Sequence, residues 1–131
     1  WNYAIKNDLE KLAYDVSRNL IETTEPSVEL ITVEEMDSLV QLGNVQLIDV
    51  RTPEEYNEGH IESALNINFY DDNFEELIEQ VDKSKPVAVY CGKGGRSAKC
   101  ASFMKNAGFT KIYDLNGGIT EWKFKGKELT K

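Results

Sequence analysis

The sequence contains few of the residues that build metal sites or disulfide frameworks. Two cysteines and one histidine occur in 131 residues, too small a set of donors for a structural zinc site. Cys91 and Cys100 fall on a predicted loop and on the helix after it, so we expect no disulfide between them. We expect the protein to use neither a metal nor another cofactor.

Long apolar runs and an excess of cationic residues are also missing. No stretch approaches the roughly 18 to 20 apolar residues that a membrane-spanning helix requires. The 15 lysines and arginines are outnumbered by 23 aspartates and glutamates, and the net charge of −8 argues against nucleic acid as a partner. We expect a soluble protein. Because the chain begins at Trp1 rather than methionine, a cytoplasmic and an exported location both stay open.

Length and composition indicate one globular domain preceded by an extension. The chain is 40% hydrophobic and 29% charged, as is usual for a domain that buries a core. Apolar residues recur at spacings of three and four over residues 2–23, which predicts an amphipathic helix that either packs on the domain or binds a partner. Residues 23–27 include a proline and predict a linker. We therefore divide the chain into an extension with its linker over 1–27 and a domain over 28–131, and we expect a monomer.

Short apolar segments alternate with amphipathic ones through the rest of the chain. Strands are predicted over 28–31, 45–49, 64–67, 87–90 and 111–113. Helices are predicted over 33–42, 53–58, 73–81, 97–107 and 119–124. Their N-caps are expected at Thr32, Thr52, Asp72 and Ser97. The alternation predicts an α/β fold with a mostly parallel sheet that is covered by helices on both faces.

Cys91 stands where a predicted buried strand meets a glycine-rich loop. Gly92, Gly94 and Gly95 let the chain turn through positive φ angles and expose its backbone N–H groups, and a helix follows at once. Inward amides and a helix N-terminus stabilise negative charge, so we expect a thiol of lowered pKa that is nucleophilic at neutral pH. The alternative is that Cys91 is only a small buried apolar residue.

The charge pattern around this loop favours an anionic ligand. Between residues 83 and 113 there is no aspartate or glutamate. The segment holds seven cationic residues, Lys83, Lys85, Lys93, Arg96, Lys99, Lys105 and Lys111. A basic island in an acidic chain predicts a small anion at the cysteine, whereas Lys105 and Lys111 could equally belong to a solvated helix face.

Three motifs together resemble the single-domain rhodaneses, a family of sulfurtransferases. The first is Asp49-Val-Arg51 followed by Glu55-Tyr56 and Gly59-His-Ile61. The second is Tyr90-Cys-Gly-Lys-Gly-Gly-Arg-Ser97, and the third is Leu115-Asn-Gly-Gly-Ile119 with Trp122. The resemblance covers roughly residues 28–125. It implies a central parallel five-stranded sheet with helices on both faces.

The resemblance also implies a chemistry. Cys91 would take sulfur from a small anionic donor such as thiosulfate as a persulfide, and a thiol, a protein or cyanide would accept it. The amides of Gly92, Lys93, Gly94, Gly95 and Arg96 would cradle the outer sulfur; Lys93 would attract the donor, and Arg96 would contact the anion or brace the loop. Two residues depart from the family pattern: Gly92 stands where arginine is frequent, and Ser63 where glycine is frequent. Gly92 leaves the preferred donor open.

Two other functions remain open. Cysteine-dependent phosphatases and arsenate reductases also use a cysteine loop that ends in arginine, but they place one residue more between the two than the four of Gly92–Gly95. The other function is a regulatory binding module or a persulfide carrier with little thiosulfate turnover. We expect His60 to be a hydrogen-bonded turn residue rather than a base, Asp49 and Arg51 to tie loops together, and Cys100 to belong to the core.

Overall fold

The computed structural model describes residues 26–131. The helix predicted over 2–23 lies outside the described residues, and so does most of the predicted extension. Within the described part, no helix has the length and apolar character needed to cross a membrane.

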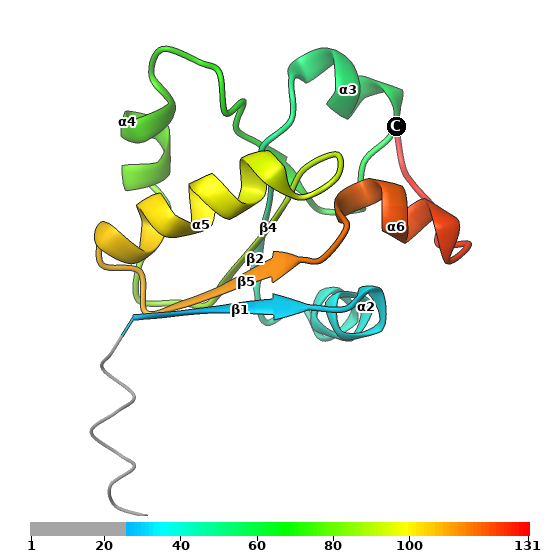
Figure 1. Ribbon diagram of the computed structural model, residues 1–131, viewed down its shortest axis with the longest axis horizontal. Helices are drawn as coiled ribbons and strands as arrows, with labels where there is room; N and C mark the ends of the chain where they lie inside the picture. The colour runs from blue at the N-terminus through cyan, green and yellow to red at the C-terminus, as the bar shows by residue number, and fades with distance from the viewer. Residues whose placement is uncertain (1–25) are drawn as a thin grey trace, which may run out of the picture.

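Strands and helices alternate along the described chain, as the sequence predicts. The order is β1 (Ser27–Ile31), α2 (Val33–Leu42), β2 (Gln46–Asp49), α3 (Pro53–Glu58), β3 (Leu65–Asn66), α4 (Phe74–Glu79), β4 (Val87–Tyr90), α5 (Gly95–Asn106), β5 (Lys111–Leu115) and α6 (Gly118–Phe124). All five strands are parallel and lie in the order β1-β5-β4-β2-β3 (Figure 1). The predicted five-stranded parallel sheet is confirmed.

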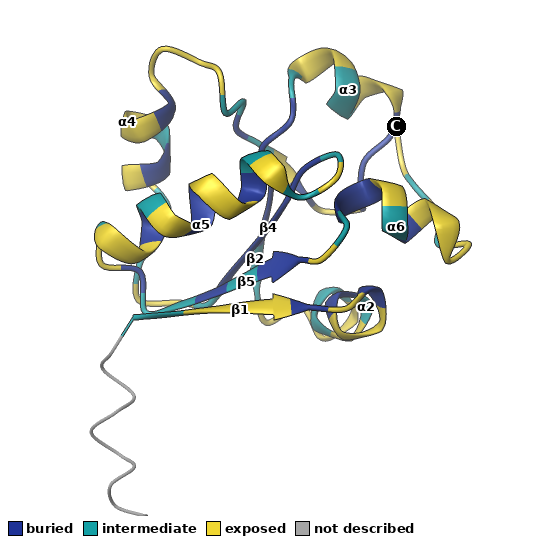
Figure 2. Ribbon diagram, viewed as in Figure 1, coloured by how far each residue is buried: buried dark blue, intermediate teal, exposed yellow. Residues whose placement is uncertain are grey.

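Two apolar layers hold the helices against the sheet. Successive strand residues point to opposite faces, so Val87 and Val89 of β4 face one layer while Ala88 and Tyr90 face the other. The first layer is completed by side chains of α4 and α5, and the second by side chains of α2 and α6. Because both faces are covered, every residue of β4 is buried, and this central strand is a rigid base for the loop that follows it (Figure 2).

The helix starts agree with the sequence at two positions and differ at two others. Thr32 and Thr52 are N-caps as predicted, and each forms a capping box with the glutamate three residues later. Asp72 does not cap α4. Asn73 precedes that helix without a side-chain cap, and the Asp71 carboxylate accepts a hydrogen bond from the Asn73 amide at 2.8 Å in a turn. The N-cap predicted at Ser97 is also wrong, because α5 begins two residues earlier, after Gly94 at φ 120°.

Candidate functional site

Cys91 follows β4 directly, at the carboxyl ends of the strands. Its loop lies between α3 and the start of α6 (Figure 1). The amide of Ile119 donates to the Cys91 carbonyl at 2.9 Å, and the amide of Thr120 donates to the Gly92 carbonyl at 3.0 Å. The N-terminus of α6 therefore fixes the backbone of the cysteine loop.

Gly118 allows this close approach between α6 and the loop. It has a φ of 60°, and a Cβ atom there would lie only 2.5 Å from the Cys91 carbonyl oxygen. Only glycine fits a left-handed conformation with no room for a side chain. The third sequence motif thus acts on the second through backbone contact.

The thiol of Cys91 is enclosed by the start of α5. The Gly94 amide donates to Sγ at 3.0 Å, and the Cys91 side chain is 1% exposed. The amide and the N-terminus of a 12-residue helix both favour negative charge on the sulfur. Of the predicted loop residues, Gly92, Lys93, Gly95 and Arg96 line the same cavity as Cys91, whereas Gly94 contributes its N–H group.

Ser97 contacts the sulfur from the other side. Cys91 Sγ lies 3.6 Å from Ser97 Oγ, and Ser97 Oγ lies 2.6 Å from Asp114 Oδ1, both within hydrogen-bonding range. Both partners of the serine come from strand ends, Cys91 after β4 and Asp114 in β5. Local sequence suggests that the Ser97 hydroxyl caps a helix. In the structure it instead forms a hydrogen bond with Asp114, which lies 17 positions later in the chain.

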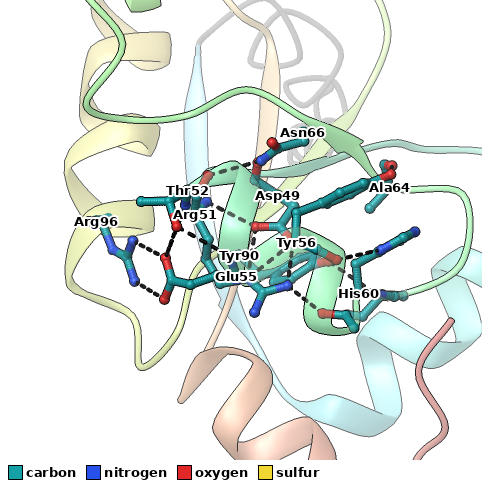
Figure 3. A network of polar contacts seen from close by, with 12 residues as sticks. Asp49, Arg51, Thr52, Glu55, Tyr56, His60, Ala64, Asn66, Tyr90 and Arg96 are labelled. Carbon is teal, nitrogen blue, oxygen red and sulfur yellow. Dashed lines mark hydrogen bonds and ion pairs between the residues drawn. The ribbon is translucent and has the colours of Figure 1, made fainter. Parts of the chain in front are cut away.

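Arg96 braces the loop against α3. Its guanidinium donates two hydrogen bonds to Glu55, at 2.8 and 3.1 Å, and Glu55 also holds Thr52 at the start of α3 (Figure 3). The hydrogen bond from Arg96 lowers the pKa of Glu55 to about 2, and the same pairing raises the pKa of Arg96. The guanidinium lies over the loop, 3.2 Å from where a Cβ atom of Gly92 would stand. The contacts fit the bracing role rather than a free anion-binding arginine.

A second cluster of polar residues stabilises the loop after β2. Arg51 pairs with Asp49 at 2.7 Å and donates to the Gly59 carbonyl at 2.7 Å, and both side chains are buried. The ring of His60 stacks on Tyr56 at a centroid distance of 3.7 Å, and its Nδ1 lies 2.9 Å from the Tyr56 carbonyl oxygen. These contacts agree with the structural roles predicted for all three motif residues.

The cavity over Cys91 has a volume of about 620 Å³ and a basic rim. Lys93 from the loop, Lys99 from α5 and Lys123 from α6 all line it. Among residues 26–131, none of these three lysines forms an ion pair. Their charges are therefore available to an anion that enters toward the sulfur. A larger cavity of about 720 Å³ lies between β3 and α4, away from Cys91.

Several residues of this site are not predicted by the sequence. Glu55 is identified in the sequence only as part of the first motif, without a role at the cysteine loop, and Tyr70, whose ring centroid lies 5.8 Å from the Arg96 guanidinium, gives no sequence signal. Lys123 falls outside the basic segment. Asp114 has a signal, because it is the only charged residue among the buried positions of β5.

Several known proteins with a rhodanese-like domain resemble this chain. Residues 32–125 match the family described as Rhodanese-like domain. The chain is 31% identical over 96 residues to the thiosulfate sulfurtransferase GlpE of Shewanella oneidensis, a match that covers 73% of this chain and 93% of that one. It is 38% identical over 85 residues to GlpE of Coxiella burnetii, with coverage of 65% and 78%. The crystal structure of a rhodanese-related protein from Thermoplasma volcanium superposes with a TM-score of 0.70 at 27% identity, covering 78% of this chain and 97% of that one.

Proposed function

The chain belongs to the rhodanese-like domain family, and from this premise we propose that it is a sulfurtransferase that carries sulfane sulfur on Cys91. The observation that carries the proposal is the position of Sγ, 3.0 Å from the Gly94 amide at the start of α5, in a cavity with a basic rim. An N–H donor and a helix N-terminus stabilise a thiolate, which is the nucleophilic form of cysteine.

The reaction proceeds by two displacements. The Cys91 thiolate attacks the outer sulfur of thiosulfate, the sulfur–sulfur bond of the donor breaks, and sulfite leaves with its electron pair. The negative charge then resides on the outer sulfur of a Cys91 persulfide, where the loop amides stabilise it. A thiolate or cyanide acceptor attacks that outer sulfur, and Cys91 departs as a thiolate. Neither displacement requires a metal or a redox cofactor.

The basic rim serves the donor. Lys93, Lys99 and Lys123 come from three different segments and surround one opening, so a dianion meets positive charge from several directions. Arg96 is hydrogen-bonded to Glu55 and holds the cysteine loop in place. We assign donor attraction to the lysines and bracing to the arginine.

Two observations favour sulfur transfer over phosphate hydrolysis. The loop has four residues between Cys91 and Arg96, a smaller ring than the phosphatases use, and the guanidinium that would hold a phosphate is bonded to Glu55. The decisive assay is thiocyanate formation from thiosulfate and cyanide, measured beside hydrolysis of an aryl phosphate.

In that assay we expect thiocyanate to form with the wild type and with Cys100→Ala, and not with Cys91→Ser. Cys100→Ala is the matched control, since Cys100 is the other cysteine and is buried in the core away from the cavity. Aryl phosphate hydrolysis that requires Cys91, in the absence of thiocyanate formation, would refute the proposal.

A further inference from the structure

Asp114 is a buried acid that the displacement chemistry leaves without a role. It lies in β5 on the face toward α5, and 4% of it is exposed. Among residues 26–131, its only polar side-chain partner is Ser97. A buried carboxylate without a cation is costly, so the protonated form is favoured there.

Ser97 connects this carboxyl group to the nucleophile. Its Oγ lies 2.6 Å from Asp114 Oδ1 and 3.6 Å from Cys91 Sγ, and the residue itself is fully buried. A hydroxyl group has one proton to donate and lone pairs to accept with. When Ser97 donates to an ionised Asp114, it can only accept from the Cys91 thiol. When Asp114 is protonated and donates to Ser97, the serine hydroxyl can donate to a thiolate or to the Gly94 carbonyl oxygen, which lies 3.2 Å from it.

We propose that Asp114, acting through Ser97, is the internal acceptor of the Cys91 thiol proton, so that the resting site holds a thiolate and a neutral carboxylic acid. This inference rests on the proposed role of Cys91 as the nucleophile. The sulfur–hydrogen bond breaks, the proton passes to Ser97 Oγ, and the serine proton passes to Asp114 Oδ1. The electron pair stays on Sγ, and the total charge of the two groups is unchanged.

The two ends of this relay differ in how well they hold a negative charge. Sγ receives the Gly94 N–H and faces the N-terminus of α5, whereas Asp114 is buried on the same face of β5 as the core residue Ile112. Burial raises the pKa of Asp114, with the Ser97 hydrogen bond acting in the opposite direction. The charge is therefore better placed on sulfur. An anionic donor that enters the cavity then meets one thiolate, without a second buried anion behind it.

The other charged and titratable groups near the pair do not share this proton. Cys100, on the same face of α5, has its pKa raised to about 12 by burial and stays a neutral thiol. Arg96 of α5 is paired with Glu55 of α3. Arg51, which also lines the cavity, is paired with Asp49. Lys93, Lys99, Lys123 and Glu58 line the cavity, and Asp114 is not among its lining residues.

The test is a pH titration of the Asp114 carboxyl group that is monitored by NMR. The aspartates are labelled at the carboxyl carbon, and the signal of Asp114 is assigned as the one that is missing in Asp114→Asn. A thiolate within about 6 Å of a buried carboxyl group raises its pKa by about one to two pH units. In the wild type, we therefore expect Asp114 to lose its proton about one to two pH units higher than in Cys91→Ser, which has no thiolate. Asp82, an exposed aspartate bonded to Ser84, is the internal control and should titrate alike in both proteins. Equal titration of Asp114 in the two proteins, or a lower pKa in the wild type, would overturn the proposal.

A second measurement tests the serine. The rate at which iodoacetamide alkylates Cys91, read by peptide mass spectrometry, should have its pH midpoint raised in Ser97→Ala and restored in Ser97→Thr, which keeps the hydroxyl group. If Ser97 has only a packing role, Ser97→Ala will change the melting temperature but not the pH midpoint of alkylation. That result would contradict the relay. Neither measurement uses a sulfur donor. Both therefore test the proton relay independently of whether the protein transfers sulfur.

Discussion

The ion pair between Arg96 and Glu55 yields the most quantitative prediction, since it links the cysteine loop to α3. Hydrogen bonds from Arg96, and to a lesser extent from Thr52, lower the pKa of Glu55 from 4.5 to about 2, which corresponds to roughly 3 kcal/mol if fully expressed. Because 37% of the Glu55 side chain is exposed, solvent screening reduces this value. We expect Glu55→Gln to lower the free energy of unfolding by about 1–2 kcal/mol at pH 7, part of it from the weakened capping box.

The pH dependence of this loss has a defined sign. The folded pKa of Glu55 is depressed, so its stabilisation is present above the unfolded value of 4.5 and disappears as the pH falls toward about 2. The difference between wild type and Glu55→Gln should therefore shrink across that window. A glutamine, which has no charge to lose, gives no such dependence.

Urea unfolding at a series of pH values measures both quantities. Glu29→Gln is the matched control, because Glu29 pairs with Lys111 on the exposed edge of β1 and its loss should cost less than about 0.5 kcal/mol. Sulfur uptake from thiosulfate should also slow in Glu55→Gln, since Arg96 loses its anchor. Equal unfolding free energies of wild type and Glu55→Gln at pH 7 would refute the bracing role.

Three further predictions concern the loop, its rim and its support. Gly118→Ala should displace the cysteine loop and abolish sulfur uptake, while Gly43→Ala, which has a similar φ of 72° but open space around it, should cost only about 1 kcal/mol of unfolding free energy. Lys93→Gln should raise KM for thiosulfate more than it changes kcat, and this effect should be smaller at high salt. The control Lys105→Gln should leave KM unchanged. Equal effects of the two substitutions on KM would contradict the assignment of Lys93 to the cavity rim. Asp49→Asn leaves the buried Arg51 guanidinium unpaired and should lower the free energy of unfolding by about 3–5 kcal/mol, measured with denaturant. A loss below about 1 kcal/mol would contradict a stabilising role of this ion pair.

The features that the sequence predicts well are those set by local spacing. The capping boxes at Thr32 and Thr52 place two helix starts through contacts three residues apart, and both are found. The apolar run of Val87–Tyr90 predicts a central buried strand, and the parallel sheet follows from the alternation of strands with helices. The position of Cys91 at the end of that strand follows in turn.

The features that the sequence does not predict depend on contacts between distant segments. Ser97 has the residue type of an N-cap, but Asp114 in β5 takes its hydroxyl group and Gly94 provides the turn into α5. Whether Arg96 binds an anion or braces the loop depends on Glu55, which lies 41 positions earlier. Lys123 joins the cavity only because α6 packs on the loop. Such partners cannot be read from local pattern.

The central claim, that Cys91 carries sulfane sulfur, is tested most directly by intact-protein mass spectrometry after incubation with thiosulfate. We predict that the wild type gains the mass of one sulfur atom, that fragmentation places it on the peptide containing Cys91, and that cyanide removes it. Cys91→Ser should gain nothing, and Cys100→Ala should behave as the wild type. A folded wild type with a reactive thiol that takes up no sulfur from thiosulfate or from a protein persulfide would contradict the account.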